Sequence, residues 1–117
     1  MEDYNFDISL TKKIFKDDEE SLIDLIKTFL KYTPESLNEM LLKINENNME
    51  EVAFLAHKMI PGISFFGLKE VEKKLLIIED MAKNNQNPQF IKDELYKTKE
   101  IIEHFMTYLR KEFNIKS

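Results

Sequence analysis

Apolar residues recur every three or four positions along most of this chain, which is the period of an amphipathic helix rather than of a strand. The longest apolar stripe stays in phase across Pro34, so we predict one helix over residues 17–46 that is kinked at the proline. Asp17, with Glu20 three residues later, is typical of a capping box at the start of this helix. Its inward face comprises Leu22, Leu25, Ile26, Phe29, Leu30, Thr33, Leu37, Met40, Leu41 and Ile44.

A short helix is expected before this long one and a further helix after it. Ser9 is placed to cap the short helix, whose inward side chains are Leu10, Ile14 and Phe15. Asn48, with an acid at the third helical position, starts the following helix, which we expect to end near residues 65–67. The inward arc of that helix consists of Met49, Val52, Ala53, Ala56, Met59, Ile60 and Ile63.

Two more helices complete the chain. One is predicted over residues 68–84, and a polar loop separates it from the last helix, which begins with Asn87 at the N-cap and Pro88 at the first helical position. The inward residues of the former are Leu68, Val71, Leu75, Ile78 and Ala82, and those of the latter are Ile91, Leu95, Thr98, Ile102, Phe105 and Leu109. Glu79 also falls on the inward arc of residues 68–84, where we expect a partly buried, hydrogen-bonded acid rather than a catalytic one.

The connections between these helices are short, which makes successive helices antiparallel neighbours. Only two glycines and three prolines are present, so a sheet with many tight turns is disfavoured. The chain is therefore expected to be a single all-α domain over residues 1–117. Its predicted architecture is an antiparallel up-down four-helix bundle with an additional short N-terminal helix across one end.

Charge and composition narrow the classes of partner and chemistry. The net charge of −5 argues against nucleic acid as a partner, because phosphate backbones are bound by basic surfaces. The absence of cysteine excludes disulfides and thiolate chemistry. There is neither a signal-peptide pattern nor an apolar run of the roughly 20 residues that span a bilayer. We therefore expect a cytoplasmic protein without direct membrane insertion, tethered to a membrane only if a larger protein anchors it.

His57 is the residue whose position most suggests a function. It lies just outside the inward arc, about 100° round the helix from Ala56. Phe54, Pro61 and Ser64 lie beside it on the outer face, at helical spacings. Two interpretations are open at this point: an ordinary surface histidine, or a reactive imidazole on a docking surface. The second histidine, His104, falls opposite its own apolar stripe and is expected to be plain surface.

The sequence around His57 resembles the histidine-containing phosphotransfer (HPt) domain family. The resemblance is carried by the run from Ala56 to Pro61 and by Gly67, ten residues after the histidine. The family pattern is roughly Ala-His-x-Leu-Lys-Gly with a glycine at +10, on the second helix of a four-helix bundle of about this length. In the helix that follows, residues 75–79 (Leu-Leu-Ile-Ile-Glu) take the place of the family's Leu-x-x-Leu-Glu segment.

The resemblance implies a phosphorelay intermediate of a two-component system. His57 would be the phosphoacceptor, taking a phosphoryl group from the aspartate of one response-regulator receiver domain and passing it to another. It implies no catalysis by the domain alone and no cofactor of its own, because the receiver supplies Mg²⁺. Either a free protein or the C-terminal module of a hybrid sensor histidine kinase fits the pattern.

The chain departs from the family pattern at two positions. Ile60 and Pro61 stand where the family has lysine at +3, which assists the phosphoryl group, and glycine at +4, which gives the partner room. Lys58 and Lys83 are candidate replacements for the missing charge, and Gly62 is a candidate for the missing room. Pro61 also removes the hydrogen bond that would reach the carbonyl of His57, so a local kink is expected.

The predicted docking surface consists of the residues that share or border the outer face of His57: Phe54, Lys58, Pro61, Gly62 and Ser64. An exposed phenylalanine has no folding role, and exposed apolar groups often mark partner sites. Two other classes stay open. One is a helical protein-interaction module without phosphoryl transfer, and the other is an enzyme whose site is assembled across the bundle.

Overall fold

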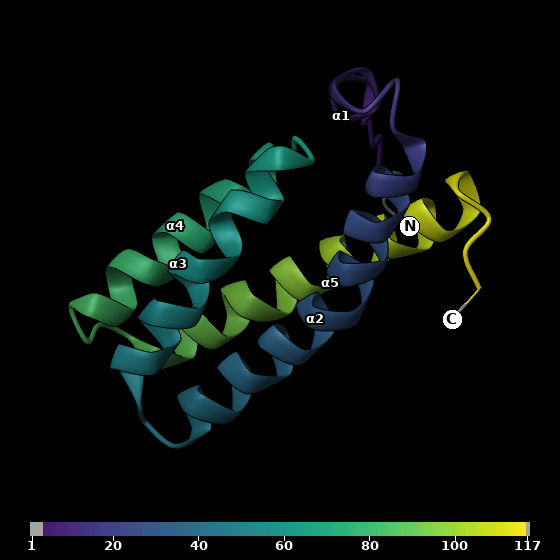
Figure 1. Cartoon of the computed structure of the whole chain (residues 1–117). Helices are drawn as coiled ribbons and strands as arrows, with labels where there is room; N and C mark the ends of the chain where they lie inside the picture. Colours follow the sequence, from purple (N-terminus) through teal and green to yellow (C-terminus); the bar gives the residue numbers. More distant parts are fainter. Residues whose placement is uncertain (1–3, 117) are drawn as a thin grey trace.

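The computed structural model describes residues 4–116, which form five α-helices and contain no β-strand within that range (Figure 1). The predicted all-α class is confirmed, and the predicted helices are all present. They are α1 (Ser9–Ile14), α2 (Glu19–Asn45), α3 (Met49–Phe65), α4 (Lys69–Lys83) and α5 (Pro88–Glu112). Pro34 lies inside α2 and Pro61 inside α3, so neither proline divides its helix.

The starts of α3 and α5 are capped as predicted. The backbone N–H of Glu51 donates to the Asn48 side chain at 3.3 Å, and that of Phe90 donates to the Asn87 side chain at 3.1 Å. Pro88 follows Asn87 directly and needs no hydrogen-bond acceptor for its nitrogen. These caps depend only on residues three positions apart, which is why the sequence alone predicts them.

The predicted cap of α2 is wrong by one residue. Asp18, not Asp17, is the N-cap, and it accepts from the backbone N–H of Ser21 at 3.1 Å. The Ser21 hydroxyl also donates to the Asp18 carboxylate at 2.6 Å. Asp18 therefore makes two hydrogen bonds to the first turn, which a cap at position 17 with Glu20 as its partner would not provide.

The prediction for α1 is wrong in its cap and for two of its three inward residues, whereas Phe15 packs against the core as predicted. Ser9 is the first helical residue, and its backbone N–H donates to Asp7 at 2.9 Å, while no side chain caps the helix. Leu10 and Ile14 are 71% and 60% exposed. The inward residue is instead Thr11, whose hydroxyl donates to the backbone carbonyl of Phe65 at 3.0 Å. This contact to the end of α3 sets the rotation of α1, and periodicity within six residues cannot show it.

The four long helices bury the faces that the apolar stripes predict. α3 contacts both α2 and α4, and α5 contacts both α2 and α4. Figure 1 shows α3 and α4 running side by side. The core is filled by aliphatic side chains and by Phe66 and Phe105, whose ring centroids are 5.5 Å apart. The one long-helix stripe residue that lies largely outside the core is Leu25, which is 37% exposed.

The end of α3 requires a glycine. Gly67 has a φ of +73°, a left-handed conformation that other residues adopt at a cost, and its N–H donates to the carbonyl of Ser64. The chain then turns at once into α4, so α3 and α4 stay adjacent along their whole length. Among the residues described, no helix combines the length and the apolar character needed to cross a membrane.

Candidate functional site

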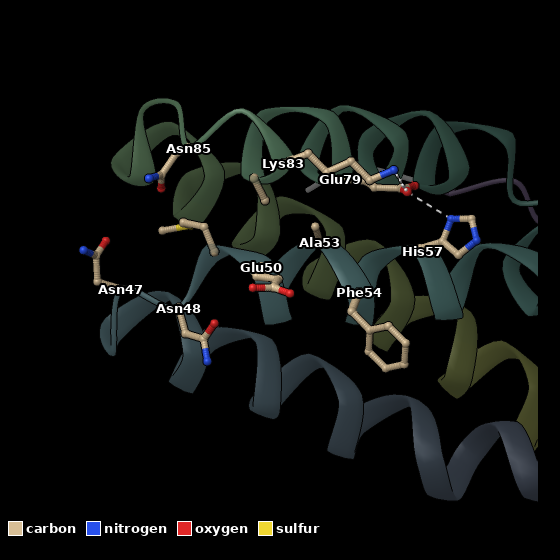
Figure 2. Close-up of a pocket in the computed structure, with 11 residues that line it drawn as sticks. Asn47, Asn48, Glu50, Ala53, Phe54, His57, Glu79, Lys83 and Asn85 are labelled. Carbon is tan, nitrogen blue, oxygen red and sulfur yellow. Dashed lines mark ion pairs between the residues drawn. The ribbon is translucent and has the colours of Figure 1, made fainter.

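His57 lies on the outer face of α3, and its side chain is 73% exposed. Its Nδ1 atom lies 3.0 Å from Oε2 of Glu79, which comes from α4. Figure 2 shows the imidazole turned so that Nδ1 faces Glu79 while the other ring nitrogen, Nε2, lies on the far side of the ring. One nitrogen is thus held by Glu79, and the other lies on the opposite side of a ring that is largely exposed.

Glu79 is the buried member of this arrangement. Its side chain is only 9% exposed and lies on the buried face of α4 with Leu75, Ile78 and Ala82. The prediction of a buried, hydrogen-bonded acid is confirmed. Its partners are His57 and Lys83, whose Nζ lies 2.9 Å from the same Oε2 atom.

The pKa of Glu79 is lowered from its ordinary value of 4.5. The hydrogen bond from Lys83 is the largest cause, and His57 contributes both charge and a hydrogen bond, while burial opposes the shift. Glu79 is therefore a carboxylate at neutral pH, and a carboxylate can only accept hydrogen bonds. Because it faces Nδ1, that nitrogen carries the ring proton in the neutral imidazole, and Nε2 keeps its lone pair.

A groove of about 790 Å³ runs along α3 and α4 from His57 towards the end of the molecule where both neighbouring loops turn. Phe54 lines it one turn before His57 and is 57% exposed, and in Figure 2 its ring points away from Glu79 and Lys83. The residues that line this groove are Asn47, Asn48, Met49, Glu50, Ala53, Phe54, His57, Glu79, Ala82, Lys83 and Asn85. We call this surface the α3–α4 groove.

A second groove, of about 450 Å³, lies on the other side of α3. We call it the α2–α3 groove. It is lined mainly by apolar and aromatic side chains, among them Phe29, Tyr32 and Phe65. Lys58 and Gly62 line this second groove rather than the first. The exposed outer face of α3 carries His57, Pro61 and Ser64, and we call it the His57 strip. The α3–α4 groove lies on one side of this strip, and the mainly apolar α2–α3 groove lies on the other.

The structure places the predicted site residues in three groups. Phe54, His57 and Lys83 lie together in the α3–α4 groove, whereas Lys58 and Gly62 lie in the α2–α3 groove. Pro61 and Ser64 are exposed on the outer face of α3, and Gly67 is exposed in the turn that follows it. All of the predicted docking residues are exposed, so none of them is buried in the core.

The two candidate replacements for the missing lysine are now distinguishable. Lys83 reaches the carboxylate that holds His57, while Lys58 lies across the helix from that contact. Ile60 is half-buried and packs against the core, as its position on the inward arc predicts. A Cβ atom at Gly62 would meet no heavy atom within 4 Å, so there is open space one residue beyond the position where the family glycine is expected.

His104 is exposed on the outer face of α5, as predicted. Its ring lies 4.8 Å from that of Tyr4, centroid to centroid, at a tilt of 43°. Tyr4 in turn stacks on Phe6, which contacts Phe105 in the core. His104 therefore serves to hold the N-terminal segment against α5, in surroundings unlike those of His57.

Sequence reasoning missed the part that Glu79 plays in the site. The available signal was the Glu79–Lys83 spacing of four residues, which pairs the two side chains on one helix. Nothing local indicated that this pair faces His57, because that depends on the register between α3 and α4. The amide groups of Asn47 and Asn85 at the far end of the groove were likewise not singled out.

Within residues 4–116 no cluster of three or more histidine, aspartate or glutamate side chains is arranged to hold a metal ion. Comparison with family models, with curated proteins and with solved structures found no match to this chain. A function for it therefore has to be argued from the residues of the site.

Proposed function

We propose that this chain is an HPt domain, a phosphorelay intermediate that accepts a phosphoryl group on His57 from one receiver-domain aspartate and passes it to another. The observation that carries the proposal is the state of the His57 ring. Its Nδ1 is held by a buried carboxylate, and its Nε2 is left as an exposed nucleophile. The family-like motif around residues 56–67 supports the same conclusion.

The chemistry of the transfer uses the two ring nitrogens differently. The Nε2 lone pair attacks the phosphorus of an aspartyl phosphate, an N–P bond forms, and the bond from phosphorus to the aspartate oxygen breaks. The aspartate leaves as a carboxylate. The Nδ1 proton stays in place, so the ring becomes positively charged as the phosphoryl group brings about two negative charges. The Glu79 carboxylate faces that proton and offsets the charge on the ring. Delivery to a second receiver is the reverse sequence.

In this proposal the receiver supplies the Mg²⁺ and the acidic pocket that surround the transferred group. The present chain supplies the imidazole and a face for docking. Neutral imidazole is a nucleophile near pH 7, so no additional base is required to activate it. In the relay the domain thus exchanges the group with a docked receiver, in the cytoplasm, either free or as part of a larger sensor kinase.

The expected architecture of such a domain is an antiparallel up-down four-helix bundle made of α2 to α5. The short connections between successive helices support it, because connections of this length join antiparallel neighbours. They comprise residues 46–48, 66–68 and 84–87. The contacts of α3 with α2 and α4, and of α5 with the same two helices, support the same arrangement. The short α1 would then lie across one end.

The exposed strip of α3 supports the docking part of the proposal. Phe54 is a large apolar side chain that lies beside the nucleophile and remains more than half exposed. Pro61, Gly62 and Ser64 continue the strip with small or uncharged groups. Such a surface lets a partner approach closely around His57.

The test is to incubate the chain with a receiver phosphorylated on its aspartate and to detect acid-labile phosphate on the chain. The parent and the His104→Gln variant should both accept the group, and His57→Gln should not, with the helical content of all three unchanged. His104 is a matched control because it is also an exposed helical histidine but lacks a buried carboxylate on Nδ1 among its described contacts. Phosphorylation of His57→Gln would refute the proposal.

A second candidate function is a protein-interaction module in which no phosphoryl group is transferred. The α2–α3 groove favours it, because this groove is apolar and lies on a face that no helix of the described chain covers. In that case His57→Gln would bind the partner as well as the parent does, and no acid-labile phosphate would appear on either.

A further inference from the structure

We infer that Lys83 is a state-dependent cation that pairs with Glu79 in the resting domain and moves to the phosphoryl group once His57 carries it. The inference rests on the proposed function and assigns to α4 the charge that the family supplies from α3. It also gives the partner-facing surface two different arrangements, one for each state of His57.

The geometry that carries the inference is the sharing of one carboxylate oxygen. Oε2 of Glu79 accepts from His57 Nδ1 at 3.0 Å and from Lys83 Nζ at 2.9 Å. The two donors are therefore neighbours, and both bind the same carboxylate oxygen at once. In Figure 2 the ammonium group of Lys83 and the ring of His57 approach this carboxylate from different directions.

Phosphoryl transfer changes the surroundings of both donors. The ring becomes positively charged while keeping its Nδ1 proton, so His57 becomes a stronger donor to Glu79. At the same time the phosphoryl group presents three acceptor oxygens with about two negative charges. The positively charged ring repels the Lys83 ammonium group beside Glu79, and the phosphoryl group on Nε2, across the ring from Glu79, offers that ammonium group a more highly charged acceptor. Both changes act in the same direction.

The burial of the two side chains decides which one moves. Glu79 is 9% exposed and fixed among core residues, whereas Lys83 is the last residue of α4 and is 64% exposed. The long aliphatic stem of a lysine lets its ammonium group swing while the backbone stays in place. Glu79 therefore remains on His57, and Lys83 exchanges partners.

Within residues 4–116, no other lysine or arginine lines the α3–α4 groove. Lys58 is the other candidate, but it lines the α2–α3 groove, on the opposite side of the His57 strip. The remaining charged group of the α3–α4 groove is Glu50, which cannot stabilise an anion. Among the described residues that line the groove with His57, Lys83 is the cation.

The experiment observes the lysine directly. The lysines of the full chain are dimethylated with ¹³C, which keeps their positive charge, and the Lys83 methyl signal is assigned by its loss in Lys83→Arg. His57 is then phosphorylated with phosphoramidate, a small donor that needs no docking. In the resting domain, Glu79→Gln should shift the Lys83 signal. In the phosphorylated domain the same substitution should leave it nearly unchanged, because Lys83 has already left Glu79.

A kinetic measurement uses the unmodified chain. Lys83→Met should shorten the lifetime of phosphohistidine by a few-fold at low salt, and high salt should narrow the difference, as expected for an exposed ion pair. Lys83→Arg should restore the lifetime because it keeps the charge, and Lys58→Met should match the parent. Rescue by arginine separates an electrostatic role from a purely structural one.

The outcomes are distinguishable. If phosphoramidate leaves no phosphate on His57 of the parent, and a phosphorylated receiver leaves none either, the proposed function is wrong and this inference is wrong with it. If His57 is phosphorylated but the Lys83 signal stays coupled to Glu79, the relay stands and the inference is overturned. An unchanged lifetime in Lys83→Met overturns it in the same way.

Discussion

The carboxylate of Glu79 on α4 holds the imidazole of His57 on α3 through Nδ1, at 3.0 Å, while the ring itself remains 73% exposed. A buried acceptor thus orients an exposed imidazole, and the two come from helices that lie side by side. The arrangement fixes which nitrogen is protonated without removing the other from solvent.

Replacing Glu79 should impair transfer more than it impairs folding. Glu79→Leu removes the acceptor for Nδ1–H and should slow phosphoryl acceptance by about tenfold, the scale of losing a residue that orients a ligand histidine. Glu79→Gln should be milder, since an amide oxygen can still accept from Nδ1–H. The rate of phosphate transfer from a receiver measures both. Glu70→Leu, at an exposed position of α4, is the control, and equal rates in Glu79→Leu and the parent would contradict the prediction.

The stability of the fold should fall in acid because of Glu94. Burial alone would raise the pKa of this carboxyl, but the hydrogen bonds and charges of Lys74 and Lys97 outweigh it, so the pKa lies below its ordinary value of 4.5. An acid whose pKa is lower in the folded state stabilises the fold at pH values above its unfolded-state pKa. This stabilisation is lost as the pH falls through the folded-state pKa.

Thermal melts from pH 7 to pH 3 test this expectation. Glu94→Gln should be less stable than the parent at pH 7, and the difference should shrink as the solution is acidified below about pH 4.5. Glu100→Gln, at an exposed position of the same helix, is the matched control. A constant difference between Glu94→Gln and the parent over the whole range would show that the ion pair with Lys74 is not what the acid removes.

Phe54→Ala should weaken binding of the receiver with little change in melting temperature. The ring is 57% exposed and lies one turn from His57, so its removal opens no cavity in the core. A central aromatic in an interface is commonly worth about 2 kcal/mol or more. Titration calorimetry with the receiver gives the affinity, and Leu42→Ala, a similarly exposed apolar residue that lines neither groove, is the control. A large fall in melting temperature with normal transfer would mean that Phe54 serves the fold.

Thr11→Val should destabilise the fold without affecting transfer. The Thr11 hydroxyl is buried and donates to the carbonyl of Phe65, which joins α1 to the end of α3. Losing it leaves that carbonyl without this donor and should cost about 1–2 kcal/mol. Chemical denaturation measures the change. Thr107→Val removes a hydroxyl of the same type from an exposed site on α5, where the loss should be small.

Much of the fold could be read from the sequence because it depends on neighbours three or four residues apart. The caps at Asn48 and Asn87, the continuity of α2 through Pro34 and the outward position of His57 all follow from spacing within a single helix. The errors lie where a distant contact overrides that spacing. α1 is rotated so that Leu10 and Ile14 face solvent, because Thr11 bonds to a carbonyl 54 residues away.

The sequence by itself determined that His57 is an exposed histidine on a helix with a family-like motif, because helical periodicity places it outside the buried arc. It also indicated that Glu79 is a buried acid. Only the tertiary structure decided that these two side chains meet, and that Lys83 rather than Lys58 stands beside them. The reason is physical: spacing along one helix defines the face of a residue, whereas the partner it meets depends on the rotation and register of the helix packed against it.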